Sequence, residues 1–296
     1  SPVETPWLPR AKAVLYTALG GEGVGEAVFQ LLYGRACPAG RLAETWPKRL
    51  EDTPAARHWP MGPDAVTYNE SIYVGYRYYD TYNKAVDYPF GFGLSYATFE
   101  VSDVKAVKTG ACTATVSAVV KNTSNVDAAE TVQVYVAPGK ADVARPKHEL
   151  KGFKKVFLKA GESAEVSFDL DDRAFSYWSE KFNDWHVESG EYAIEVGTSS
   201  RDIAGSAVVE LDGDGKAQPL TEWSNFMEWR KDPLGSKVLE KLRAEGEAGR
   251  MPIVPDNDMT RLFLDSMPIN SMSVLMGADG KQIFEYMLAE YAELTK

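Results

Sequence analysis

The sequence predicts a fold that combines α/β and all-β parts. A mixed α/β part is expected in residues 1–97, an immunoglobulin-like β-sandwich in residues 98–212, and a helical tail in residues 213–296. Three observations predict this order. A strand-length apolar run leads through a glycine turn into a helical stripe, short runs of alternating apolar and polar residues fill the middle, and helical patterning returns near the C-terminus.

The composition is that of a globular protein with an excess of acidic groups. The chain has 296 residues, of which 44% are hydrophobic, and its formal net charge is −11. Because an acidic chain repels phosphate groups, nucleic acid and anionic membranes are not expected partners. No apolar run approaches the roughly 18 residues of a membrane span. The N-terminus has no initiator methionine and no signal-peptide pattern, so we expect the chain to be a piece of a longer protein.

The first α/β element is a strand, a turn and a helix in sequence. Ala11–Leu19 is an apolar run of strand length, Gly20–Gly25 is a glycine-rich turn, and Glu26–Tyr33 continues an apolar helical stripe that Gly34 is placed to end. A phosphate cradle needs this context, but the turn matches neither dinucleotide nor P-loop spacing. We therefore interpret it as a structural turn.

An aromatic cluster ends this part of the chain. Eight of the fifteen tyrosines lie between Tyr68 and Tyr96, with glycines among them. Such rings can stack on the apolar faces of a sugar, or they can pack at a seam between domains. We favour the seam and keep the sugar site as the alternative.

The middle of the chain alternates with a period of two residues. Five runs carry this pattern most clearly, and turn signals separate them. They are Thr113–Val120, Glu130–Val136, Leu150–Leu158, Ala164–Leu170 and Gly190–Gly197. About seven short strands over some hundred residues are typical of an immunoglobulin-like β-sandwich. In the tail, Leu234–Leu242 and Gln282–Leu294 have helical patterning, and seven of the eight methionines lie there.

Cysteines and histidines are few and far apart. Two thiols cannot form a disulfide framework, so we expect Cys37 and Cys112 to be buried and free, which fits a cytoplasmic location. His58, His148 and His186 show no catalytic or metal-binding spacing, and we expect surface or core roles for them. No cofactor is expected.

Several stretches resemble the C-terminal half of the family 3 glycoside hydrolases, the β-glucosidase family. The most specific are Tyr68-Asn-Glu70 with Val74–Tyr79, and Tyr88–Tyr96. Further matches in residues 1–97 are Pro2–Leu8, Gly20–Ala27 and Pro38–Leu42. In the sandwich, Arg145–Phe153 and Trp185–Ser200 are similar to the family's fibronectin type III-like domain. The resemblance covers residues 1–210 densely and the tail more loosely.

The resemblance implies a larger enzyme with a TIM-type barrel, an α/β sandwich and a fibronectin-like domain. Residues 1–97 would then be a partial α/β sandwich, the C-terminal part of that domain, and residues 98–212 the fibronectin type III-like domain. It implies a retaining mechanism, with a nucleophilic Asp on the barrel and an acid/base Glu early in the α/β sandwich, about 5–5.5 Å apart. Neither motif occurs in these 296 residues. Both carboxylates are therefore expected upstream of Ser1, and this chain alone is expected to be inactive. The expected partner is the barrel with the first part of the α/β sandwich, in the same polypeptide, in a separate or cleaved chain, or in rearranged order.

Glu70 is the one residue of this chain that we considered as a catalytic acid. It lies among tyrosines, and burial there would favour a protonated carboxyl group. We favour a structural carboxylate paired with Arg77 or backbone amides, because the matched motif is not the family's acid/base motif. Asp80 and Asp87 are weaker candidates, and Asp169–Asp172 is interpreted as a turn rather than a calcium site.

Two hypotheses about function follow. The first is the C-terminal part of a retaining β-glucosidase that removes terminal β-linked glucose from oligosaccharides or glycosides, with a small β-glucoside as substrate. The alternative is a non-catalytic module for carbohydrate binding or scaffolding. Exposed coplanar aromatic rings would favour the alternative, and we expect the candidate rings of Trp178, Trp185 and Trp223 to be buried. Homo-oligomers and the choice among related β-glycosides remain open.

Overall fold

The chain divides into two compact units. The structure, a computed structural model, describes residues 2–56, 58–59, 62, 64–216, 219–254 and 258–295. The first unit comprises residues 1–179 and 183–215, and the second comprises residues 216–296 together with 180–182.

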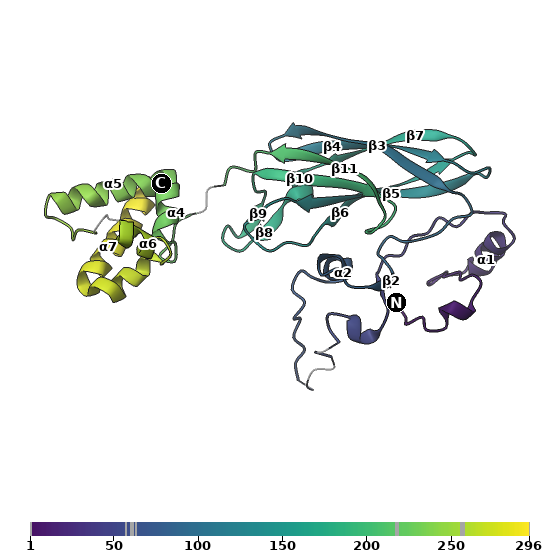
Figure 1. The fold of residues 1–296 in the computed structure, drawn as a ribbon, viewed down its shortest axis with the longest axis horizontal. Coiled ribbons are helices and arrows are strands. Elements are labelled where there is room, and N and C mark those ends of the chain that lie inside the picture. The colour runs from purple at the N-terminus through teal and green to yellow at the C-terminus, as the bar shows by residue number, and fades with distance from the viewer. Residues whose placement is uncertain are drawn as a thin grey trace. The chain divides into compact units, whose positions relative to one another are not determined.

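Seven long strands of the first unit form a β-sandwich (Figure 1). One sheet has the order β3-β4-β7 and the other β11-β10-β5-β6, with antiparallel neighbours throughout. The strands are β3 (Phe99–Gly110), β4 (Thr113–Asn122), β5 (Ala128–Pro138), β6 (Glu149–Leu158), β7 (Ser163–Leu170), β10 (Gly190–Gly197) and β11 (Ile203–Leu211). The predicted all-β sandwich is confirmed.

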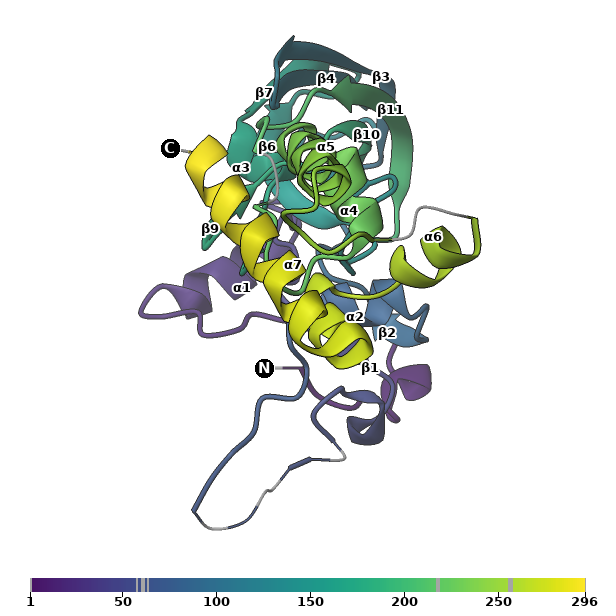
Figure 2. The ribbon, with the colours of Figure 1, turned by 90° about the vertical axis from the view of Figure 1, so that its left-hand side faces the viewer.

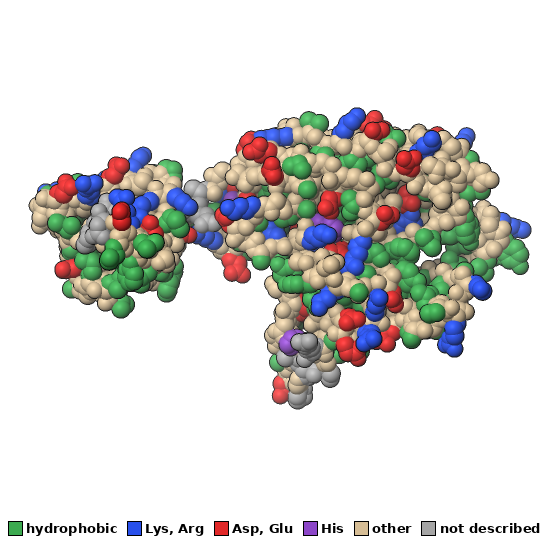
Figure 3. All heavy atoms as spheres, viewed as in Figure 1, with side chains coloured by type: hydrophobic (Ala, Val, Ile, Leu, Met, Phe, Trp, Pro, Cys, Tyr) green, Lys and Arg blue, Asp and Glu red, His purple; other side chains and the backbone are tan. Residues whose placement is uncertain are grey.

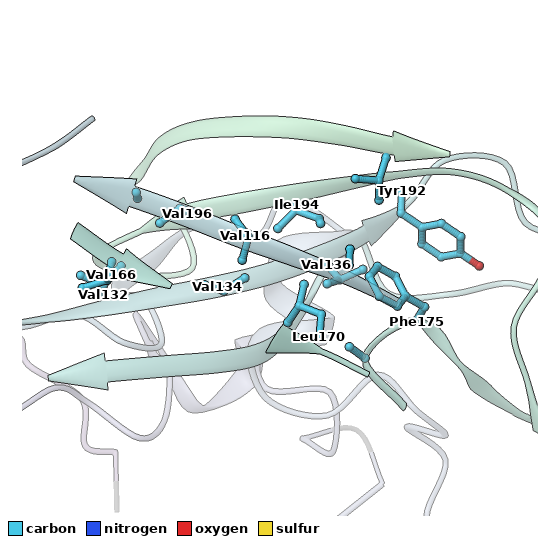
Figure 4. Close-up of a cluster of buried hydrophobic side chains, with 14 of the residues drawn as sticks. Val116, Val132, Val134, Val136, Val166, Leu170, Phe175, Tyr192, Ile194 and Val196 are labelled. Atoms are coloured by element: carbon cyan, nitrogen blue, oxygen red, sulfur yellow. The ribbon is translucent and has the colours of Figure 1, made fainter. Parts of the chain in front are cut away.

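The core of the sandwich explains why the period-2 pattern is informative. Residues of β4 alternate between buried positions and half-buried or exposed ones, and Val116 and Val120 are fully buried. Figure 4 shows Val116, Val134 and Ile194 in this cluster of buried side chains between the sheets. Burying one such side chain contributes about 1.5–3 kcal/mol. The repeated valines therefore decide which face of each strand turns inward.

The described residues before the sandwich contain only short regular elements. They are the 3-10 helices η1 (Leu8–Arg10) and η2 (Leu50–Asp52), the helices α1 (Val24–Leu32) and α2 (Tyr76–Thr81), and the paired strands β1 (Trp46–Pro47) and β2 (Val86–Tyr88). The predicted helix is confirmed, and Gly34 follows it with φ of 66°. A left-handed residue just beyond a helix is a common way to end it.

The prediction of a strand at Ala11–Leu19 was wrong. These residues adopt no strand, Val14 is 50% exposed, and Leu19 is fully exposed. A strand needs a neighbour whose backbone groups pair with its own. The Tyr16 ring meets that of Trp46 in β1, with centroids 5.1 Å apart, but none of the described strands pairs with this run, so its apolar character produces no sheet.

Helix α1 likewise lacks a covering layer. It has no buried residue, although its apolar stripe includes Val28 and Leu31. Figure 3 shows hydrophobic side chains gathered on the surface over this helix. Among them, Leu32 is 65% exposed and Tyr33 is 72% exposed. This part of the chain therefore presents an apolar surface of the kind that usually contacts another layer of protein.

The short hairpin of β8 (Tyr177–Ser179) and β9 (Asp184–His186) overturns the expectation of buried tryptophans. Trp178 is 48% exposed and Trp185 is 38% exposed. Neighbouring residues of a strand point to opposite faces. His186 and Ser179 are buried, so the paired tryptophans face the other way. Trp223, in the second unit, is 68% exposed.

The second unit is helical and has its own core. Its elements are α4 (Phe226–Lys231), α5 (Pro233–Glu247), α6 (Asp258–Leu264), the 3-10 helix η3 (Ile269–Ser271) and α7 (Met272–Leu294). Figure 2 shows α7 as its longest helix. The two predicted helices are confirmed as parts of α5 and α7, while α4 and α6 were not predicted. Trp229, Ile283 and Met287 are fully buried in this core.

Local sequence signals set the boundaries of these helices. Asn225 and Glu228 form a capping box at the start of α4, and Asp232 accepts hydrogen bonds from two backbone amides at the start of α5. Caps of this kind contribute about 1 kcal/mol each. Gly277, with φ of 59°, bends α7 near its beginning. Only glycine adopts this conformation readily, so the bend depends on it.

Candidate functional site

A hollow of about 810 Å³ lies in the first unit, among residues that precede the sandwich. Its lining is mainly apolar and includes Val3, Pro47, Leu50, Tyr76, Tyr79 and Phe90. Helix α2 supplies both tyrosines, and the segment after β2 supplies Phe90. The aromatic cluster of the sequence therefore forms part of a cavity wall.

The same aromatic residues join α2 to the sandwich. The rings of Tyr76 and Phe90 stack with centroids 4.6 Å apart, and the Tyr76 hydroxyl accepts a hydrogen bond of 2.8 Å from the Leu150 amide. Burial raises the pKa of Tyr79 to about 12, so this phenol stays neutral and provides a wall rather than a proton donor at neutral pH. The interpretation of the cluster as a seam applies to these residues, whereas Tyr68 is 87% exposed.

Two carboxylates, Glu4 and Glu44, lie on the rim of the hollow. Both residues are exposed, and the Glu4 carboxylate already accepts a hydrogen bond of 2.6 Å from the Leu50 amide. The general acid of a glycosidase requires an apolar, shielded setting, which exposed rim positions do not provide. The hollow offers a binding surface without a recognisable catalytic pair.

Glu70 lies apart from these lining residues. It is half-buried, and its backbone carbonyl accepts a hydrogen bond from the Tyr73 amide at 2.9 Å. The expected ion pair with Arg77 is wrong, because Arg77 binds Glu149 of β6 at 2.8 Å. Helix α2 directs Arg77 toward the sandwich, so the pair expected from the sequence does not form.

A charged cluster around two buried residues, Asp80 and His148, is the feature that sequence reasoning missed. Its members are Asp80 on α2, His148 beside β6, Glu195 on β10 and Arg201 after β10. His148 Nδ1 lies 2.6 Å from Glu195 Oε2, His148 Nε2 lies 3.3 Å from Asp80 Oδ2, and Arg201 Nε donates to Asp80 Oδ1 at 2.6 Å. We call these four residues the Asp80 cluster. The contacting residues are 47 to 121 positions apart in the sequence, so no short window of the sequence could indicate the cluster.

The contacts within the Asp80 cluster favour the ionised form of Asp80 and the protonated form of His148. Burial alone would raise the pKa of Asp80, but hydrogen bonds from His148 and Arg201 outweigh it and lower that pKa. Burial alone would lower the pKa of His148, but hydrogen bonds to Asp80 and Glu195 outweigh it and raise that pKa. The cluster is a structural connection between α2 and the sandwich.

The other acidic candidates have structural contacts. The Asp87 carboxylate accepts a hydrogen bond from the Thr5 hydroxyl, and Asp169 accepts one from Thr115 at 2.8 Å. Asp171 caps the short helix α3 (Asp172–Phe175) by accepting from the Ala174 amide. These carboxylates therefore stabilise turns and strands.

The remaining sequence expectations are partly corrected. Cys37 and Cys112 are free, as expected, but both are half-buried rather than buried, since Cys37 follows the uncovered helix α1 and Cys112 lies in the β3–β4 turn. Gly20–Gly25 forms a turn in which Gly21 has φ of 64°. Within the described part of the chain, no group of three or more His, Cys, Asp or Glu residues could hold a metal ion. Over the same residues, no helix combines the length and apolarity needed to cross a membrane.

Family models match two segments of the chain. The glycosyl hydrolase family 3 C-terminal domain matches residues 1–96, and the fibronectin type III-like domain matches residues 130–200. The first match ends just before β3, and the second lies within the sandwich.

Known proteins match nearly the whole chain. It is 62% identical over 291 residues to an exo-α-(1→6)-L-arabinopyranosidase of Bifidobacterium breve, covering 98% of this chain and 38% of that protein. It is 40% identical over 298 residues to thermostable β-glucosidase B of Acetivibrio thermocellus, covering 99% of this chain and 39% of that protein.

A solved structure supports the same relationship. The crystal structure of a Bifidobacterium adolescentis GH3 β-glucosidase matches with a TM-score of 0.75 and 66% identity, over 79% of this chain and 35% of that chain. The chain thus spans somewhat more than a third of the length of these relatives. Their shared fold and the two family models place it in one family: the chain belongs to the family 3 glycoside hydrolases and corresponds to their C-terminal portion.

Proposed function

We propose that this chain is the C-terminal part of a retaining exo-glycosidase whose catalytic carboxylates lie upstream of Ser1. The observation that carries this proposal is the uncovered apolar surface of residues 1–97. Helix α1 has no buried residue, and the strand-length run at 11–19 has no sheet. An upstream polypeptide would supply the missing strands and cover this surface, as the greater length of the relatives suggests.

The proposed substrate is a small glycoside that ends in a pyranose. Relatives carry the names arabinopyranosidase and β-glucosidase, so terminal α-L-arabinopyranose and terminal β-linked glucose are the two sugars to compare. We propose hydrolysis through a glycosyl-enzyme intermediate, with an Asp nucleophile and a Glu acid/base about 5–5.5 Å apart. This chain would complete the α/β domain, and its sandwich and tail would brace the barrel.

A reconstitution experiment tests this division of labour. The chain alone is expected to show no turnover of nitrophenyl β-glucoside or nitrophenyl α-L-arabinopyranoside. Addition of the upstream polypeptide is expected to restore hydrolysis, because only the complete site brings both carboxylates to one bond. Turnover by the isolated chain at enzyme-like rates would contradict the proposal, and the ratio of the two rates would identify the preferred sugar.

Covalent labelling locates the nucleophile directly. A fluorinated glycoside that traps the glycosyl-enzyme should label the upstream polypeptide of the reconstituted enzyme, as mass spectrometry of its peptides can show. The Glu70→Gln variant is a matched control that should retain activity within a few-fold. Loss of a general acid lowers rates by about 10²–10⁴-fold, so a loss of that size in Glu70→Gln, or a label on this chain, would overturn the assignment.

A second candidate function is carbohydrate binding by the β8–β9 hairpin. The exposure of Trp178 and Trp185 favours it. Their rings are nearly perpendicular, with an interplanar angle of 77°, and the Arg173 guanidinium lies over the Trp185 ring. A flat sugar face is therefore expected to bind poorly. Calorimetric titration of the chain with cello-oligosaccharides should therefore detect no binding heat. A binding heat that disappears in the Trp178→Ala variant would instead favour the binding module.

A further inference from the structure

The position of His148 between two carboxylates imposes a condition on its charge. The ring is 1% exposed, and its two nitrogens face Glu195 and Asp80 from opposite sides. A neutral imidazole carries one N–H and one lone pair, so it can donate to only one carboxylate. The other nitrogen would then direct its lone pair at a carboxylate oxygen. With both carboxyl groups ionised, only the imidazolium ion, with two donors, satisfies both contacts.

The groups around His148 leave little compensation if it loses its proton. Arg201 is the second cation of the Asp80 cluster, and it also donates to the carbonyls of Tyr79 and Lys84 at 3.1 Å and 2.8 Å. The rings of Tyr135 and Tyr76 lie 4.9 Å and 6.2 Å from the imidazole. Burial raises the pKa of both phenols, so both stay neutral. With His148 neutral, the Asp80 cluster would hold two carboxylates against one cation, and Asp80, which is only 3% exposed in its side chain, would depend on Arg201 alone.

The Asp80 cluster crosses a boundary within the first unit. Asp80 belongs to α2, whereas His148, Glu195 and Arg201 belong to the sandwich. Other contacts across the same boundary do not depend on His148. The Lys147 amide donates to the Thr81 hydroxyl at 2.9 Å, and Arg77 pairs with Glu149. Loss of the charge on His148 should therefore loosen α2 locally without unfolding the sandwich.

We propose that the protonation of His148 controls how tightly α2 is held on the sandwich, so that the connection between the tyrosine-lined hollow and the fibronectin-like domain depends on pH. The stabilisation is present in full below the pKa of an exposed histidine, about 6.5. It is lost as the pH rises through the higher pKa of the docked state. Asp80 responds to pH in the opposite direction. Its contribution to holding α2 is present at neutral pH and is lost only as the pH falls through its lowered pKa. The proposal concerns the described fold and does not depend on the substrate or on activity.

Nuclear magnetic resonance tests the proposal on the full chain. The sequence has three histidines, so ¹⁵N-histidine labelling gives few side-chain signals, and His148→Gln identifies one of them. The His148 signal should titrate above the value of an exposed histidine. Hydrogen exchange of the α2 amides, corrected for intrinsic rates, should accelerate over the same pH range. The acceleration should be about tenfold for each unit by which the pKa of His148 with α2 held on the sandwich exceeds its pKa with α2 released.

Variants separate this role from a general effect on folding. Gln is neutral and has one donor and one acceptor, so in His148→Gln the α2 amides should exchange fast at every pH, with no alkaline step. His186→Gln is the matched control, because His186 contacts Asp214 at 3.0 Å and is not a member of the Asp80 cluster. In this control, exchange of the α2 amides should still accelerate as the pH rises. A normal or lowered pKa for His148, or unchanged α2 exchange while His148 titrates in the unmodified chain, would overturn the proposal.

Discussion

Replacement of Trp229 by alanine should cost the helical unit about 3–5 kcal/mol, the range for removing a buried large aromatic side chain. Trp229 is fully buried in the core of this unit, and its ring meets that of Tyr291 edge-on at 5.4 Å. A unit of this size has a total stability of only about 5–15 kcal/mol. Urea unfolding should therefore show the loss of helical circular dichroism at a clearly lower midpoint.

The sandwich provides the internal reference for this experiment, because its core is built from other residues. A second variant, Trp229→Phe, tests the reason for the loss. The indole Nε1 is buried without a hydrogen-bond partner among the described residues. Phenylalanine keeps an aromatic ring and removes that donor, whose burial alone costs about 1–3 kcal/mol. If packing of the ring stabilises the unit, Trp229→Phe should lose less free energy of unfolding than Trp229→Ala. Equal losses in the two variants would show that packing of Trp229 is not what stabilises the unit.

Replacement of Glu130 by alanine should be about as damaging, at roughly 3–5 kcal/mol. Glu130 on β5 pairs with Arg41 from the segment before the sandwich, and both side chains are only 8% exposed. Without Glu130, the Arg41 guanidinium would remain in a buried site with no anion. Removal of one partner of a buried pair costs far more than the pair itself contributes.

Two controls make the result specific. The double variant Arg41→Met/Glu130→Leu removes both charges and should recover most of the lost stability in urea unfolding. Glu247→Ala removes a pair with Arg243 in which both side chains are mostly exposed, and it should change stability by less than about 1 kcal/mol. If Glu130→Ala costs no more than Glu247→Ala, the buried pair does not hold this segment on the sandwich.

The sandwich was predictable because its signal is local. In β4 an apolar residue recurs at every second position, whereas β5 buries a continuous run and β6 alternates poorly, and a turn follows each strand within about ten residues. Helix α1 and the two longer tail helices gave the corresponding helical signal, with Gly34 at the expected end. Family motifs then identified the first two parts of the chain, and the comparisons confirm them.

The errors share a physical cause, which is that burial depends on what lies opposite a residue. Ala11–Leu19 has strand composition but no pairing strand. Trp178 and Trp185 were expected to be buried, but they occupy the outward face of a two-stranded hairpin. Cys37 and Cys112 are half-buried for the same kind of reason.

By itself, the sequence determined most strands of the sandwich, the helices α1, α5 and α7, the family, and the absence of a recognisable catalytic motif from these residues. Those properties are recorded in short windows of the chain, as periodicity or as motif. Only the tertiary structure decided that Asp80, His148, Glu195 and Arg201 meet in one cluster, and that Arg77 pairs with Glu149. Ion pairs and hydrogen bonds form only between groups in contact, and the distance between residues far apart in sequence is set by the fold alone.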